Sequence, residues 1–168
     1  METNIYTDPI IRKYQELIKA AMPGVFKSFY QGDPVRIPKS NMPALIISKT
    51  QTTTEVFTDV EDDHRISLIL TVVSDMRDER SEDMEMSTGV AKLYDILEGR
   101  DANYKLKTDT VLHVLRSNIG VDTALNLRTD LGTSTRVDYG MTINKRQDGG
   151  YAIEGSVEFL ARYSQLRA

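Results

Sequence analysis

The chain has 168 residues, a net charge of −4 and a pI near 5.2, so it fits one domain, 1–168, that can bury its own core. The acidic balance argues against strong phosphate binding by the whole surface, because such binding depends on Lys and Arg. The absence of cysteine excludes disulfides, thiolate nucleophiles and Cys-ligated zinc. No apolar run reaches the ~18 residues of a membrane span, and the N-terminus lacks the apolar core of a signal peptide. We therefore expect a soluble protein made inside the cell, with no membrane partner.

A helix is predicted directly after Asp8-Pro9. Asp8 is a suitable N-cap, and proline is favoured at the first helical position because its missing N–H has no partner there anyway. Apolar residues then recur at intervals of three and four, and we expect them to form one buried face: Ile10, Tyr14, Leu17, Ile18 and Ala21. Pro23-Gly24 is expected to end the helix.

Short extended segments are predicted next, within and after a proline-punctuated stretch. Residues 25–30 fit a short strand and residues 44–49 a short buried strand. The β-branched and aromatic residues of 52–58 favour a further strand or an extended arm.

The clearest strand covers residues 65–74. Alternate positions are apolar on one face, and the other face is half apolar, which predicts a central strand covered on both sides. The charged connection "MRDERSED" follows at residues 76–83. Ser81 is a suitable N-cap for a second helix whose apolar stripe lies between Met84 and Leu97 and which ends at Gly99.

A strand is predicted over residues 110–115 ("TVLHVL"), and residues 117–133 are expected to be irregular. The chain then predicts a hairpin from residues 135–146, a turn at 148–150 and a strand at 151–165. The second arm alternates strictly from Tyr151 to Tyr163, which is about 40 Å of strand at ~3.3 Å per residue. Such a hairpin either projects beyond the core or pairs with another chain.

These elements predict an α+β domain. We expect a mixed, mostly antiparallel β-sheet with two main helices packed on one face and a long C-terminal β-hairpin.

No catalytic, cofactor-binding or metal-binding residue is indicated, so we expect no enzyme. His64 and His113 both lie in apolar alternation and fit structural or surface roles. The acidic runs at 61–63 and 78–79 lack the spacing of a calcium loop. Neither glycine-rich phosphate-binding motif occurs.

The sequence does offer surface for self-association, because unpaired strand edges invite partners. The candidate assembly-interface residues lie in the charged connection and in the extended segment before the central strand: Arg77, Asp78, Glu79, Arg80, Thr53 and Phe57. A monomer with long loops is the alternative interpretation.

The order of elements resembles a known family. It has an N-terminal helix, "IPKSNMPALIISKTQT" (37–52), the strand "HRISLILTVV" (64–73), a charged loop, the helix "AKLYDILEG" (91–99) and the closing strand "AIEGSVEFLARYSQ" (152–165). This pattern resembles the tail terminator proteins of long-tailed bacteriophages, the group that includes the tail-to-head joining proteins.

The resemblance implies a homo-oligomeric ring, usually a hexamer, without cofactor or catalysis. Such a ring caps the tail tube protein, stops its polymerisation and presents a surface to the head connector or adaptor protein. DNA would pass through the lumen without specific binding, which suits an acidic chain. The resemblance places the protein in the virion tail or neck after assembly in the host cytoplasm.

Two other functions stay open on sequence alone. One is another head–tail connector component, such as an adaptor or head-completion protein. The other is a small enzyme or ligand-binding α+β domain, which would need a pocket with converging polar groups near His64 or His113.

Overall fold

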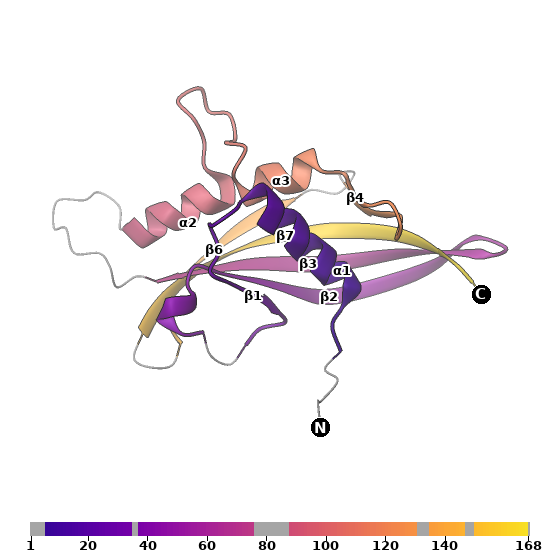
Figure 1. Ribbon diagram of the computed structural model, residues 1–168, viewed down its shortest axis with the longest axis horizontal. Helices are drawn as coiled ribbons and strands as arrows, with labels where there is room; N and C mark the ends of the chain where they lie inside the picture. Colours follow the sequence, from indigo (N-terminus) through magenta and orange to yellow (C-terminus); the bar gives the residue numbers. More distant parts are fainter. Residues whose placement is uncertain (1–5, 35–36, 76–87, 131–134, 147–149, 168) are drawn as a thin grey trace.

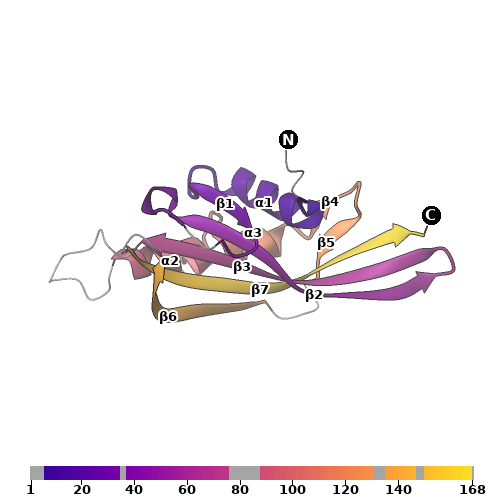
Figure 2. The same ribbon diagram turned by 90° about the horizontal axis from the view of Figure 1, so that it is seen from below.

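The structure, a computed structural model, describes residues 6–34, 37–75, 88–130, 135–146 and 150–167. It is an α+β domain, as predicted: a curled, mostly antiparallel sheet of seven strands carries the described helices on one face (Figure 1, Figure 2). In chain order the described elements are α1 (Pro9–Ala21), β1 (Ser28–Gln31), the 3₁₀ turn η1 (Lys39–Asn41), β2 (Ala44–Thr58), β3 (Glu61–Asp75), α2 (Thr88–Glu98), α3 (Val111–Ser117), β4 (Gly120–Asp122), β5 (Leu127–Thr129), β6 (Arg136–Arg146) and β7 (Gly150–Leu166).

Strand β7 lies inside the sheet and pairs with three other strands, β3, β5 and β6. The strand order is β1-β2-β3-β7-β5-β4, and β6 also pairs with β7. One edge of β7 follows β3 from end to end, while its other edge pairs with β6 in its first half and with β5 further on. Only β1 and β2 run parallel among the described pairs. The predicted β6–β7 hairpin is confirmed, although its turn at 147–149 lies outside the described residues.

The predicted N-cap of α1 is also confirmed. Asp8 Oδ1 accepts hydrogen bonds from the backbone N–H groups of Ile10 at 2.9 Å and Ile11 at 3.1 Å, which pairs donors that an uncapped helix leaves without partners. The helix ends at Met22, just before Pro23. Of the predicted apolar face, Ile10, Tyr14 and Ile18 are buried, Leu17 is half-buried and Ala21 is exposed.

The core lies between the helices and one face of the sheet. It combines apolar side chains of α1, α2 and α3 with alternate residues of β3 and β7, including Ile66, Leu68, Leu70, Val72, Val157 and Phe159. At Gly155 of β7, α2 lies so close that an added Cβ would stand 2.4 Å from Leu97 Cδ1. A side chain there would have to displace Leu97, so glycine permits the close approach of this helix.

Strand β3 is central, but the prediction that both its faces are covered is wrong along most of its described length. Ser67, Ile69 and Thr71 point away from the helices and remain partly exposed. A second cluster covers the other face only near the β1 end of the sheet, where Val73 packs with its neighbours: Ile37, Met42, Ala44, Ile46 and Ala152.

The strand predicted for residues 110–115 is wrong, because this segment begins helix α3. The Thr110 hydroxyl accepts a hydrogen bond from the backbone N–H of His113 at 3.3 Å. Val111, Val114 and Leu115 are buried at helical spacing, so packing overrides the β preference of the valines. The prediction that 117–133 is irregular is also wrong in part, since β4 and β5 lie there.

Two predicted segments join into one long strand. Residues 44–49 and 52–58 form the single 15-residue strand β2, with a bulge between Lys49 and Gln51. Strand β3 begins at Glu61, four positions before the predicted start. The charged connection and the predicted start of the second helix lie outside the described residues, and α2 is described from Thr88 onward.

Candidate assembly surface

Strands β2 and β3 continue beyond the helices as a hairpin, and the last part of β7 runs beside them (Figure 1, Figure 2). We call residues 49–65 and 162–167 the arm. In Figure 1 the arm forms the tapering right-hand end of the molecule, next to the described end of the chain. Its residues contribute little to the apolar core, so other contacts must hold its three strands together.

One face of the arm is held by an ion pair whose carboxylate is buried. The Arg162 Nε lies 2.9 Å from both carboxylate oxygens of Asp63, and its Nη2 lies 2.8 Å from Oδ2. Asp63 is only 4% exposed, and hydrogen bonding to its carboxylate raises the pKa of Arg162. Such a forked, charge-assisted contact fixes the register of β3 against β7.

The opposite face of the arm is held by an aromatic stack and a hydroxyl. The rings of His64 and Tyr163 stack with centroids 4.6 Å apart and planes at 23°. The Thr54 hydroxyl lies 2.9 Å from His64 Nδ1. These three residues come from adjacent strands in the order β2, β3 and β7, so they bind all three strands together.

The tip of the arm exposes large apolar side chains. Val56 is 71% exposed, Phe57 60%, Val60 60% and Leu166 68%. Phe57 lies in a bulge between Val56 and Thr58, which interrupts the pairing of β2 with β3. Single exposed apolar residues are normal on a protein surface, but several gathered at one protruding tip indicate an interaction site.

Arg167 fixes the conformation of this tip. Its Nη2 donates a 2.6 Å hydrogen bond to the Thr58 carbonyl, and its Nε lies 3.2 Å from Asp62 Oδ1. Its backbone N–H donates to the Val60 carbonyl at 2.7 Å. The turn is thus held by three contacts from one residue, so its apolar side chains are presented by an ordered backbone.

The arm also has an unpaired strand edge. Strand β1 pairs with β2 only as far as Ile47, and Gly32 donates one further hydrogen bond to the Ile47 carbonyl. From Lys49 to Thr58, the described part of the chain provides no strand on the outer side of β2. The threonine-rich segment 50–54 gives this edge a high β propensity with no proline to block pairing.

The predicted interface residues divide between the arm and a segment outside the described residues. Thr53 and Phe57 both lie exposed on the arm. Arg77, Asp78, Glu79 and Arg80 lie within 76–87, so the structure does not place them. The sequence reasoning missed Val56, Val60 and Leu166 at the tip, although the acids around Val60 in "TDVEDD" were a signal of a solvent-facing turn.

A groove of about 570 Å³ lies where the arm meets α1. Apolar side chains of α1, the arm, the chain before α1 and the β4–β5 connection line it: Tyr6, Pro9, Ile10, Leu125, Tyr163 and Leu166. The ion pair between Asp8 and Lys49 crosses from the helix to the arm at this groove. Burial alone would raise the pKa of Asp8, but hydrogen bonds from Lys49, Ile11 and Ile10 outweigh it and lower that pKa.

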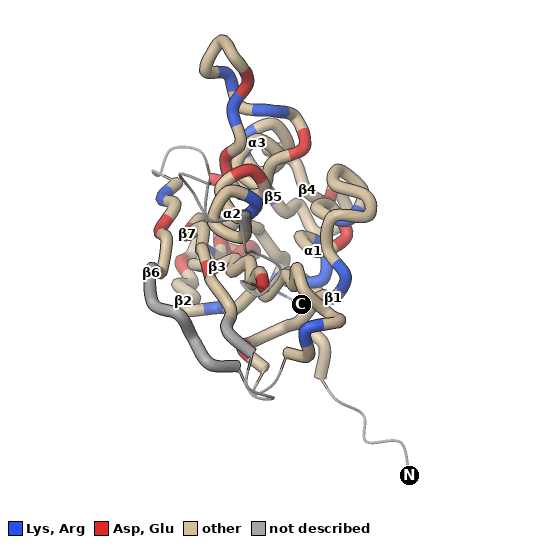
Figure 3. The backbone as a smooth tube through the Cα atoms, turned by 90° about the vertical axis from the view of Figure 1, so that its left-hand side faces the viewer, with Lys and Arg blue, Asp and Glu red and all other residues tan. Residues whose placement is uncertain are grey.

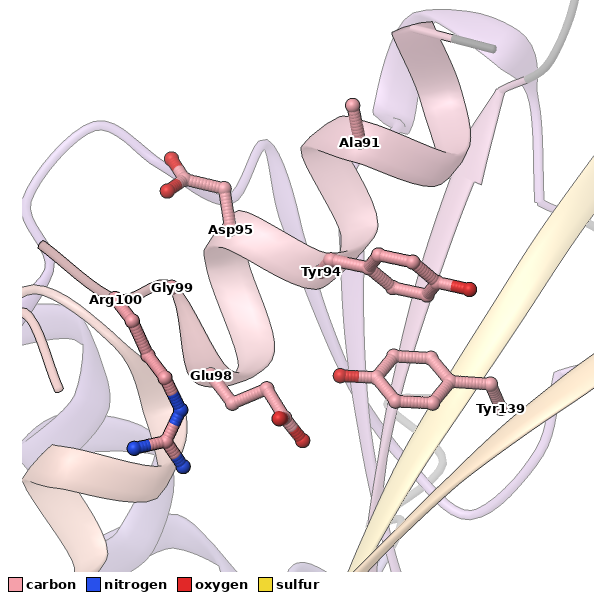
Figure 4. A pocket seen from close by; sticks show the side chains of 7 residues that line it. All are labelled: Ala91, Tyr94, Asp95, Glu98, Gly99, Arg100 and Tyr139. Carbon is pink, nitrogen blue, oxygen red and sulfur yellow. The ribbon is translucent and has the colours of Figure 1, made fainter. Parts of the chain in front are cut away.

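A second hollow, a cleft of about 460 Å³, lies beside the end of α2 (Figure 4). The rings of Tyr94 and Tyr139 meet edge to face with centroids 4.5 Å apart, and Glu98 lies near the Tyr139 hydroxyl. Burial raises the pKa of Tyr139, and the charge of Glu98 adds to this shift. Lys107 binds Asp95 at 2.7 Å. The cleft therefore combines a packed tyrosine pair with an ion pair that joins α2 to the loop before α3.

Neither histidine lines the groove or the cleft. His64 is part of the arm's aromatic stack, and His113 lies on α3, where its ring nitrogens are 3.2 and 3.3 Å from the Ser117 hydroxyl. Within the described residues there is no group of three or more His, Asp or Glu that could hold a metal ion. No helix in the same part of the chain is long and apolar enough to cross a membrane.

Comparison with protein-family models and with curated proteins found no match to this chain. The arm, with its exposed apolar tip and unpaired edge, is therefore the feature from which we argue function.

Proposed function

We propose that this protein is a structural virion protein whose copies form a closed ring of the tail terminator kind. The ring caps the phage tail tube, stops its polymerisation and joins the tail to the head connector. The observation that carries this proposal is the arm: an ordered protrusion whose apolar tip and β2 edge are left uncovered by the described chain. The order of elements in the sequence, which resembles that family, supplies the phage context.

The apolar tip of the arm faces water in the single chain. A partner that covers Phe57 and its apolar neighbours removes their surface from water. This burial stabilises the complex by roughly 25 cal/mol per Å² of apolar area. The arm lies at one end of the molecule, and we propose that the next copy receives it on a different surface. Such a head-to-tail contact generates a ring when its rotation closes. Interfaces of ~800 Å² per partner are ordinary for stable assemblies.

The charge of the protein supports passage of DNA without retention. The chain carries 25 acidic and 21 basic residues, so every copy adds negative charge to the ring. Phosphates bind proteins through Lys and Arg, and an acidic lumen repels them.

The test is to count subunits by native mass spectrometry and light scattering, first alone and then with the tube protein of the same phage. We expect six-subunit rings, either alone or once tube is present, and tubes of shorter mean length in electron micrographs. A monomer under both conditions overturns the proposal. A stable ring of twelve that leaves tube length unchanged supports the connector or adaptor alternative instead.

A further inference from the structure

We propose that the arm tip of one copy docks on a basic surface around α1 of the next copy. This inference rests on the proposed function and names the two surfaces that make the ring contact. The two surfaces are present on every chain, differ from one another and match in charge, which is the requirement for a head-to-tail interface.

The donor surface is apolar and acidic. Residues 55–62 contain four acids, Glu55, Asp59, Glu61 and Asp62, and no Lys or Arg. Asp62 is bound by Arg167 and Glu55 lies 3.8 Å from Arg65. Asp59 and Glu61 make no salt bridge within the described chain, and they flank the exposed side chain of Val60. The tip therefore presents negative charge directly beside apolar area.

The receiving surface is the outer face of α1 with the chain that follows it, and we call it the basic helix face. It carries four basic residues and one acid: Arg12, Lys13, Lys19, Lys27 and Glu16. Arg12 and Glu16 form an i,i+4 pair 3.4 Å apart, and Lys19 continues the same row. The backbone drawing in Figure 3 shows blue segments, which mark Lys and Arg, on and beside α1.

The basic helix face also offers apolar contact area. Lys19 Nζ lies 5.8 Å from the centre of the Phe29 ring, and that ring is only partly buried. Ala20 is exposed and Leu17 is half-buried on the same helix. An apolar side chain such as Phe57 can pack against Phe29 and Leu17 while its acidic neighbours meet Lys19 and Lys27. Both components of the tip thus find their counterpart here.

The backbone of the tip is already held in one conformation before docking. Because Arg167 already fixes the turn through Thr58, Val60 and Asp62, docking does not have to order a loop. A surface that is pre-organised loses less conformational entropy on binding. An acidic turn that served only solubility would not need such a clamp.

The test uses paired charge reversals and light scattering over a concentration series. Asp59→Lys with Glu61→Lys reverses the tip, and Lys19→Glu with Lys27→Glu reverses the helix face. We expect each reversed chain to raise the concentration at half assembly by about tenfold or more, because like charges then oppose one another. Combining all four substitutions in one chain should restore assembly, and an equimolar mixture of the two reversed chains should assemble as alternating copies.

The control for the helix reversal is Lys92→Glu with Lys105→Glu, which makes the same charge change at exposed positions away from α1. It should assemble as the unaltered chain does. Thermal unfolding of every variant confirms that it folds, which is expected because the altered positions lie on the surface. If the unaltered chain assembles and the helix-reversed chain does so equally well, the docking inference is overturned while the ring proposal stands. If the unaltered chain assembles neither alone nor with the tube protein, both are overturned.

Discussion

The body beneath the helices and the arm beyond them use the same strands but are stabilised in different ways. In the body, β3 and β7 bury alternate apolar side chains against three described helices, and Leu68, Leu70 and Val157 are fully covered. In the arm the same two strands are linked by Asp63–Arg162 and by His64–Tyr163, while apolar side chains at the tip face water. One continuous strand pair thus builds the apolar core at one end and carries the exposed tip, which we propose as a docking surface, at the other.

The largest effect is expected in the body, where Leu70→Ala should cost about 2–5 kcal/mol of unfolding free energy. Leu70 is 0% exposed in the middle of the core, so the substitution removes apolar contacts and leaves a cavity. Urea unfolding followed by circular dichroism measures this loss. A cost below ~1 kcal/mol would show that the body is not the stabilising region.

The buried ion pair of the arm should give the next largest effect. Asp63→Ala removes a buried carboxylate and leaves the partly exposed Arg162 without its forked partner, so we expect a loss of about 2 kcal/mol. Glu55→Ala, also on the arm, is the matched control: Glu55 lies 3.8 Å from Arg65 and is largely exposed, and its loss should stay within ~0.5 kcal/mol. Equal losses for the two variants would contradict the distinction between buried and exposed pairs.

A smaller effect is expected at Asp8, which links the two regions by capping α1 and binding Lys49 of the arm. Asp8→Ala should cost about 1 kcal/mol through loss of the cap. Because folding lowers the pKa of Asp8, its ionic contribution is complete above the unfolded pKa near 3.9 and is lost as pH falls through the folded value.

Asp8→Asn separates the two contributions of this residue. It keeps a capping oxygen and removes the charge, so its unfolding free energy should fall less steeply than that of the unaltered protein between about pH 5 and pH 2. Urea unfolding at a series of pH values provides the comparison. Identical pH profiles would show that the Lys49 contact contributes nothing in solution.

The smallest effect on stability is expected at the tip. A variant there separates the contribution of a side chain to folding from its contribution to assembly. Phe57→Ser removes a side chain that is 60% exposed, so the unfolding free energy of the isolated subunit should change by no more than ~0.5 kcal/mol. Assembly should nevertheless weaken, as measured by light scattering. A large loss of stability with unchanged assembly would reverse the roles that we give to body and arm.

Much of the body could be predicted because its patterns are local. Strict alternation from Ile66 to Val72 and from Tyr151 to Tyr163 predicts long strands, and Asp8-Pro9 marks the start of α1. The run "TVLHVL" gave the wrong prediction of a strand at residues 110–115. Valines fit either a strand or a short helix, and only packing decides between them. Its spacing of Val111, Val114 and Leu115 already allowed the helix that is observed.

The arm could be predicted only in outline. Residues 52–58 indicated an extended segment, and Thr53 and Phe57 were named from it. The contacts that shape the arm join residues far apart in the chain: Asp63 and Arg162 are 99 positions apart, and Thr58 and Arg167 are 109 positions apart. No local pattern reveals such pairs, since long-range contacts follow from the topology of the sheet.

The position of β7 in the chain has a consequence for biosynthesis. This strand is the partner of β3, β5 and β6, and it is translated after all of them. A nascent polypeptide still emerging from the ribosome therefore holds β3 with one edge empty and lacks the Arg167 clamp. In the assembly that we propose, a newly made subunit therefore gains its docking tip only after β7 and Arg167 have been translated.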